Sequence, residues 1–273
     1  MIYTHKIIIK ILFLIFLFSN SAYSKSLEQV IESKFRTADY KKRDIYRNPL
    51  ETLSFFDITD NMTIIELQPS GGNSPAGWYT EILAPYLKNN GLLIAAHFNP
   101  KESNWRAEMR SNFELLIKKK PDYRNIKMSM LSMPPGKLAE DNSADMILTF
   151  RNLHNWLKSN SLKEVFKVSY QALKPGGILG VVEHRAPKNY KIEDMIKSGY
   201  VSESLAINYA QEVGFVLDKK SEINANLNDT KDHVNGVWNL PPTLKLNNAK
   251  ERKKYLAMGE SDRMTLRFIK PVK

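Results

Sequence analysis

The chain has 273 residues, a net charge of +11 and no cysteine. Its hydrophobic content of 42% and charged content of 25% exclude a largely disordered chain, and the length predicts one large domain or two small ones. A sequence without cysteine excludes disulfides and a lipid-modified N-terminal cysteine.

The first 24 residues have the pattern of a secretory signal peptide. Lys6 and Lys10 precede an apolar run over residues 11–18, and small polar residues follow up to Ser24, after which we expect cleavage. The alternative is an uncleaved membrane anchor, although the run is shorter than the roughly 20 apolar residues that span a bilayer. Export without disulfides favours the periplasm, so the predicted location is periplasmic or secreted.

The rest of the chain is basic, but its charges are scattered. The leader holds two of the lysines and no acid, which leaves a net charge of +9. Short basic groups at residues 41–43, 118–120 and 252–254 are typical of solvated surfaces, or alternatively of a weak attraction to an anionic membrane surface. The sequence has no long basic arm and the chain is expected to be exported, so we predict no nucleic-acid partner.

Residues 25–60 predict an N-terminal helical segment. Residues 26–36 have an amphipathic helical pattern. A further helix is expected to begin at Asn48, with Pro49 at its first position and Glu51 at the capping-box position.

Residues 61–273 alternate between strands and helices. Strands are expected at residues 62–67, 92–96, 126–131, 144–150, 178–183, 215–223 and 264–269. Helices are expected at residues 78–87, 102–118, 161–173 and 202–213, and residues 174–177 read as a turn before the fifth strand. This alternation predicts a doubly wound, mostly parallel α/β sheet.

Residues 224–260 break this rhythm. They contain the stretch from Trp238 to Pro242 and one expected helix, around residues 248–257. A connection this long in a compact domain is usually functional or disordered. We interpret it as a lid over the site, or else as a plain surface insertion.

The turn after the first expected strand is a candidate nucleotide site, because ligands of open α/β sheets bind beyond the carboxyl ends of the strands. A carboxylate, a turn and a helix N-terminus suit a ligand that carries a ribose. Glycine allows the backbone to approach such a ligand closely, although this turn has fewer glycines than usual. The candidate residues are Glu66, Gln68, Pro69, Ser70, Gly71 and Gly72.

Three histidines follow expected strands and so lie at the same edge of the sheet. His154 and His184 follow neighbouring strands, which are ~4.8 Å apart, whereas His97 lies roughly 10 Å from His154. Asn152 and Glu183 are on the same rim, which therefore reads as a polar binding cleft, or else as exposed loop residues. The histidines show no HxH or HxxxH spacing, and adjacent strand residues point to opposite faces, so no metal is predicted.

Several stretches carry a resemblance to a known family. They are IIELQPSGGNSPAGWYTEILAPYL from residue 64, LTFRNLHNW ending at residue 156, LKPGGILGVVEHRA from residue 173, SEINAN from residue 221, VWNLPP from residue 237 and GESDRMTLRFIKP from residue 259. With them the chain resembles class I S-adenosylmethionine-dependent methyltransferases. It is most similar to a bacterial group of predicted methyltransferases that carry signal peptides.

The resemblance implies a Rossmann-like methyltransferase fold, with seven strands in the order 3-2-1-4-5-7-6 and the last one antiparallel. It also implies the cofactor S-adenosyl-L-methionine. Glu66 matches the acid of the first family motif. The acid that usually holds the ribose is replaced by His97, so His97 or Asn99 would take its place, and Met133 stands near the missing acid after strand three. Tyr79 either packs on the cofactor or belongs to the core.

We therefore predict an exported methyltransferase for a small acceptor molecule. His154 or His184 would be the general base, Glu183 would orient it, and Asn152 would complete the catalytic group. Two departures from the family pattern, His97 and the missing acid, favour an alternative: a non-catalytic periplasmic ligand-binding protein that reuses the fold. A third reading is an enzyme that uses the histidine rim without a cofactor. The identity of the acceptor and the oligomeric state are left open at this point.

Overall fold

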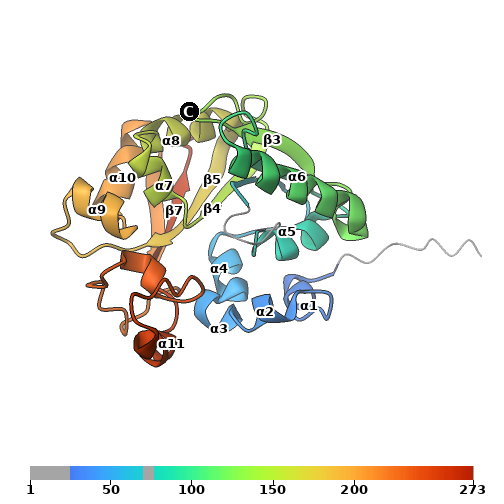
Figure 1. Ribbon diagram of the computed structural model, residues 1–273. Coiled ribbons are helices and arrows are strands. Elements are labelled where there is room, and N and C mark those ends of the chain that lie inside the picture. Colours follow the sequence, from blue (N-terminus) through green and yellow to red (C-terminus); the bar gives the residue numbers. More distant parts are fainter. Residues whose placement is uncertain (1–24, 70–76, 273) are drawn as a thin grey trace, which may run out of the picture.

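A computed structural model describes residues 25–69 and 77–272 of the chain (Figure 1). The predicted leader, residues 1–24, lies outside the described residues, and so do Ser70, Gly71 and Gly72 of the predicted turn. No helix of the described residues is long and apolar enough to cross a membrane.

One seven-stranded sheet forms the centre of the protein, in the predicted order 3-2-1-4-5-7-6. β7 runs antiparallel to both of its neighbours and the other strands are parallel, which confirms the expected Rossmann-like fold. The strands are β1 (Thr63–Leu67), β2 (Leu92–Phe98), β3 (Lys127–Leu131), β4 (Ala144–Phe150), β5 (Leu173–His184), β6 (Val216–Ser221) and β7 (Arg263–Ile269).

Helices cover both faces of the sheet, because successive strand residues point to opposite faces (Figure 1). In β1, Ile65 and Leu67 pack in one core, while Ile64 packs in the other. The first core is covered by α7 (Leu153–Lys158), α8 (Leu162–Ala172), α9 (Ile192–Ser198) and α10 (Glu203–Glu212). The second is covered by α1 (Leu27–Ile31), α4 (Pro49–Phe55), α5 (Thr80–Leu87) and α6 (Asn104–Lys119).

The N-terminal segment is more broken than the sequence predicted. The helix expected over residues 26–36 ends at Ile31, and α2 (Ala38–Lys41) and α3 (Asp44–Arg47) follow before α4. We had expected Asn48 to cap α4 with its side chain, but the side chain makes no capping hydrogen bond. It also ends α3, in a left-handed conformation with φ of 39°, and its side-chain amide donates a hydrogen bond to the Ile223 carbonyl at 2.7 Å.

Residues 174–177 are part of β5 rather than a separate turn. Leu173 already pairs with Ala144, and the register then shifts so that Ile178 pairs with Met146. Gly176 takes up this irregularity with φ of 80°, a conformation that favours glycine. The strand is therefore interrupted by a bulge at the place where the sequence predicted its start.

The segment over residues 224–260 has little regular structure, as predicted. It contains η2 (Gly236–Asn239), η3 (Ala249–Glu251) and α11 (Arg252–Met258), and the last two together correspond to the single expected helix. This segment and helices α1–α4 lie at one side of the sheet, near the carboxyl ends of its parallel strands (Figure 1).

Candidate functional site

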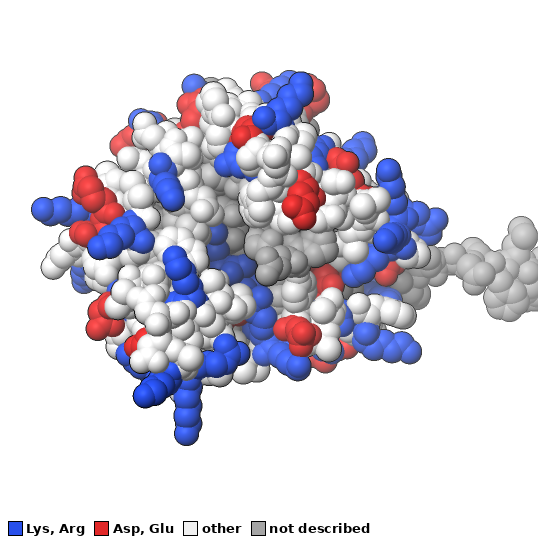
Figure 2. Space-filling view, viewed as in Figure 1, with Lys and Arg blue, Asp and Glu red and all other residues white. Residues whose placement is uncertain are grey.

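A cavity of about 1140 Å³ opens at the carboxyl ends of β1, β4 and β5. Its wall combines the turn after β1, the loop after β4, helix α7, the end of β5 and residues 237–243, and it is visible as a hollow in the middle of Figure 2. Pockets for small molecules usually measure roughly 300–1,000 Å³, so this cavity is just above the usual range. Its position is the one expected for ligands of an open α/β sheet.

The end of β1 supplies a buried carboxyl group to the cavity. Glu66 is 2% exposed, and the Thr80 hydroxyl donates a hydrogen bond to its Oε2 at 2.7 Å. Burial raises the pKa of Glu66 to about 8, and this hydrogen bond offsets only part of the rise. Glu66 therefore holds a proton at neutral pH and presents an uncharged carboxylic acid to the cavity.

The turn after Glu66 bends at a residue that is not glycine. Gln68 has φ of 45°, and its side-chain oxygen accepts a hydrogen bond from the Trp156 indole at 2.9 Å. This bond ties the turn to α7 and stabilises a backbone conformation that usually favours glycine. Gly77 closes the far end of the turn, where a Cβ atom would lie only 1.6 Å from the Pro69 carbonyl oxygen.

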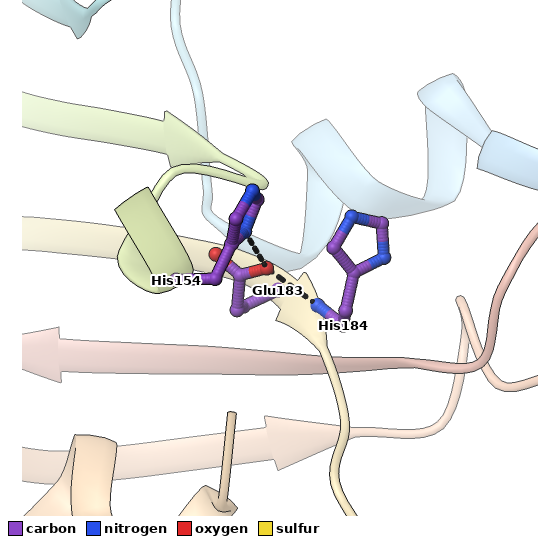
Figure 3. A group of neighbouring side chains, drawn as sticks. All are labelled: His154, Glu183 and His184. Atoms are coloured by element: carbon purple, nitrogen blue, oxygen red, sulfur yellow. Dashed lines mark hydrogen bonds and ion pairs between the residues drawn. The ribbon is translucent and has the colours of Figure 1, made fainter. Parts of the chain in front are cut away.

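His154, Glu183 and His184 form one buried group (Figure 3). The Leu153 amide donates to Glu183 Oε2 at 2.5 Å and the His184 amide donates to Oε1 at 2.8 Å. His154 Nδ1 lies 3.1 Å from the same Oε1. Both Glu183 oxygens already accept a backbone N–H, so His154 Nδ1 is best placed to donate in this contact, and Nε2 is not engaged by Glu183.

The imidazole rings of His154 and His184 lie close together. The sequence predicted that the side chains of the adjacent residues Glu183 and His184 point to opposite faces, but both reach the group that contains His154. Helix α7 nevertheless brings the rings of His154 and His184 to 5.4 Å between centroids. His184 Nδ1 is 2.5 Å from the Ser261 hydroxyl.

The charge around this group favours proton transfer over metal binding. One ligand atom from each of the three residues lies within 4.8 Å of the others, so a metal ion is sterically conceivable. Burial, His154, Arg263 and Arg151, in that order, lower the pKa of His184 well below its usual value, so it is neutral at pH 7. The same arginines would repel a bound cation.

Three further predicted residues lie at the cavity: Asn152, Tyr79 and Met133. The Asn152 amide donates to the Leu67 carbonyl at 3.0 Å, which joins the ends of β1 and β4. Tyr79 stacks on Phe150 with 3.5 Å between ring centroids, so it belongs to the core and to the cavity wall at once.

His97 and Asn99 are not part of the cavity wall. His97 is completely buried, and its ring lies 4.9 Å from that of Phe113 in α6. The alternation along β2 places its side chain beneath α6, on the side of Ala95. Burial lowers the pKa of His97 to about 3, so it is a neutral core residue. The His97 side chain therefore does not reach the cavity, where the sequence expected it to hold a ribose.

The sequence did not single out the arginines of the cavity. Arg43, Arg151 and Arg263 line it, together with Trp238 from the segment predicted as a lid or insertion. Only Arg151 had a sequence signal, its position directly after β4. Arg43 and Arg263 come from opposite ends of the chain, and only the tertiary structure brings them together.

The comparisons with known proteins match the fold but not the sequence. No protein-family model matches the chain, and a search of curated proteins finds no significant match. Among solved structures, a SAM-dependent methyltransferase from Aquifex aeolicus is similar, with a TM-score of 0.51 and 16% identity over 73% of this chain and 94% of its own. A SAM-dependent methyltransferase from Methanosarcina mazei has a TM-score of 0.52 and 11% identity over 81% and 97%.

A third solved structure of the same fold carries a different activity in its name. The [4+2]-cyclase SpnF has a TM-score of 0.57 and 12% identity over 89% of this chain and 84% of its own. Identities this low establish the fold alone. The chain therefore has the fold of SAM-dependent methyltransferases, and its activity must be argued from its own site.

Proposed function

We propose that the protein is an exported S-adenosylmethionine-dependent methyltransferase that acts on a small acceptor molecule. The observation that carries this proposal is a single cavity with the buried Glu66 carboxyl group at the end of β1 and the Glu183–His154 carboxylate–imidazole pair beside β4 and β5. The fold shared with SAM-dependent methyltransferases supports it. Export rests on the leader pattern alone.

The residues at the end of β1 fit the proposed cofactor. The neutral acid of Glu66 can donate one hydrogen bond and accept others from ribose hydroxyls or an amino-acid end. Gly77 leaves no room for a side chain, because its backbone packs against the Pro69 carbonyl at the edge of the cavity. Aromatic walls from Phe98 and Trp105 suit a flat base. By sequence, Gln68, Pro69 and residues 70–72 complete this site.

S-adenosylmethionine, when bound, supplies a methyl group on a strongly electrophilic sulfonium. The chain's own residues then need only orient the acceptor and take its proton. His154 is the better base of the two histidines, because Glu183 holds its Nδ1 and fixes the tautomer that leaves Nε2 as an acceptor. Glu183 is a positioning residue, held in turn by the Leu153 and His184 amides.

Calorimetry with S-adenosylmethionine and S-adenosylhomocysteine tests the cofactor site. We expect micromolar binding to the purified chain, and loss of that binding in Glu66→Ala. Glu81→Ala is the matched control, because Glu81 is also a buried carboxylate of this region but contacts Thr37 instead of the cavity. The absence of heat with either ligand would refute the proposal and favour the non-catalytic binding protein.

Turnover tests the base. With a panel of small carboxylates, phosphates, amines and phenols as acceptors, the release of S-adenosylhomocysteine measures the reaction. His154→Ala should keep cofactor affinity and reduce kcat about 100-fold or more, the usual contribution of a general base. His233→Ala is the control, because this buried histidine bonds Asp229 away from the cavity. If His154→Ala and His184→Ala both turn over at the wild-type rate, neither histidine takes part in the mechanism.

A further inference from the structure

Four arginines converge beside the histidines, and the carboxylate of Glu260 lies among them. Arg47, Arg263, Arg43 and Arg151 all act electrostatically on Glu260. Arg43 Nε lies 2.5 Å and Arg47 Nε lies 3.1 Å from its carboxylate oxygens, and Arg263 also pairs with it. Burial alone would raise the pKa of Glu260, but these arginines outweigh it and hold the pKa well below its usual range.

The described residues leave this group short of negative charge. The carboxylates of Glu260 and Glu183 face four guanidinium groups, and Arg47, Arg263 and Glu260 are each no more than 2% exposed. Buried charges are normally paired, because an unpaired charge loses its hydration and gains no partner in return. Burial and the neighbouring Arg263 accordingly lower the pKa of Arg151 to about 10.

Several guanidinium nitrogens of the group also lack hydrogen-bond partners. Among the described residues, Arg43 Nη2, Arg47 Nη1 and Nη2, and Arg263 Nε are buried without one. Arg151 is half-buried, and its charge interacts with those of Glu260 and Glu183. Buried donors are nearly always satisfied, by protein or by something bound.

The group faces the cavity. Arg43, Arg151 and Arg263 line it, and Figure 2 shows basic side chains inside the hollow. Arg151 and Arg263 are also close enough to His184 to lower its pKa. The excess positive charge of the arginines therefore lies next to the proposed base rather than on the outer surface. Arg151 has φ of 62°, a strained conformation that positions its side chain at this point.

We propose that the three arginines of this group that line the cavity, Arg43, Arg151 and Arg263, bind an anionic group, a carboxylate or a phosphate, of the acceptor molecule. Guanidinium groups suit both anions, because their paired N–H donors match two oxygens at once. The anion would neutralise the excess charge, satisfy the free donors and hold the rest of the acceptor against His154. This assignment of the acceptor class rests on the proposed methyltransferase function, whereas the anion site itself stands on the charge and geometry alone.

Calorimetry with inorganic phosphate and with malonate tests the anion site in the full chain. We expect one saturable site, with affinity at least tenfold lower in Arg151→Gln and restored to within threefold in Arg151→Lys. Arg185→Gln is the matched control: Arg185 follows β5 as Arg151 follows β4, but Asp262 and Glu222 pair with it. If Arg151→Gln does not fold by circular dichroism, Arg43→Gln takes its place.

A second arm separates the acceptor from the amino-acid end of the cofactor. 5′-Methylthioadenosine lacks that end, whereas S-adenosylhomocysteine has it. We expect phosphate to bind in the presence of saturating S-adenosylhomocysteine, and Arg151→Gln to leave the affinity for both nucleosides unchanged.

Three results would count against the proposal or its foundation. The absence of saturable binding of either anion, or equal binding in Arg151→Gln, would overturn the site. Two results together would overturn the acceptor assignment. Phosphate would compete with S-adenosylhomocysteine, and Arg151→Gln would lose affinity for S-adenosylhomocysteine but not for 5′-methylthioadenosine. Phosphate binding without any nucleoside binding would support the anion site and refute the methyltransferase function.

Discussion

Glu66 shows how one buried side chain couples the candidate site to stability. Its pKa is about 8 in the folded protein and 4.5 in the absence of burial. Between these values the folded chain holds a proton that the unfolded chain has released. The free energy of unfolding therefore decreases as the pH rises from about 4.5 to about 8, by up to about 1.4 kcal/mol per pH unit.

The variant Glu66→Gln removes this dependence. Glutamine has the same shape and no charge, so we expect the stability of the wild type relative to the variant to fall steadily between pH 5 and pH 8. Urea unfolding of both chains at pH 5, 6, 7 and 8 measures the difference. A difference that stays constant across this range would show that Glu66 titrates normally.

Other residues of the site illustrate what a strand position alone can predict. Glu66, His154 and His184 lie at the edge of the sheet where their strands end, as the sequence indicated. His97 follows the same rule along the chain, but its side chain points beneath α6. The end of a strand predicts at which edge of the sheet a residue lies. The helix that covers that face decides whether its side chain reaches the cavity.

At the scale of elements, β5 and α4 meet at a glycine. A Cβ atom on Gly180 would lie 2.6 Å from Leu148 Cδ2 and 3.0 Å from Phe56, which directly follows α4. This close approach lets the N-terminal helices pack on the sheet, and Phe56 is completely buried there. The contact therefore helps to hold the N-terminal helices against the sheet.

Gly180→Ala should therefore destabilise the fold by about 1–3 kcal/mol, because both neighbours belong to the packed core. Urea unfolding measures the loss, and the double variant Gly180→Ala, Phe56→Leu should recover part of it. Gly136→Ala is the matched control: its Cβ atom would meet only Ser132 Oγ, at 3.8 Å. If Gly180→Ala and Gly136→Ala have the same free energy of unfolding, the close approach at Gly180 does not affect stability.

At the scale of the whole molecule, Glu260 joins the two ends of the described chain. It pairs with Arg43 and Arg47 from the N-terminal segment and with Arg263 at the start of β7. All of these side chains except Arg43 are nearly inaccessible to solvent. Removal of one partner from such a buried network leaves charges that nothing compensates.

Glu260→Gln should cost about 3–5 kcal/mol and make the N-terminal helices more susceptible to proteolysis. Urea unfolding and limited trypsin digestion, read by mass spectrometry, measure the two effects. Glu32→Gln, an exposed acid of the same segment, should change stability by less than about 0.5 kcal/mol. A similarly small change in Glu260→Gln would mean that the N-terminal segment is held by its apolar contacts alone.

By itself the sequence determined the fold and the edge of the sheet that carries the site. Alternating apolar strands and amphipathic helices specify a doubly wound sheet, because each element must bury one face, and parallel strands place their carboxyl ends together. Only the tertiary structure decided which side chains share the cavity. The arginine group draws on α3, the residues before it, the end of β4 and the start of β7, and no local pattern encodes contacts between segments so far apart in the chain. The left-handed Asn48 and the bulge in β5 were decided in the same way, because packing against distant residues outweighed the local signals for a cap and a turn.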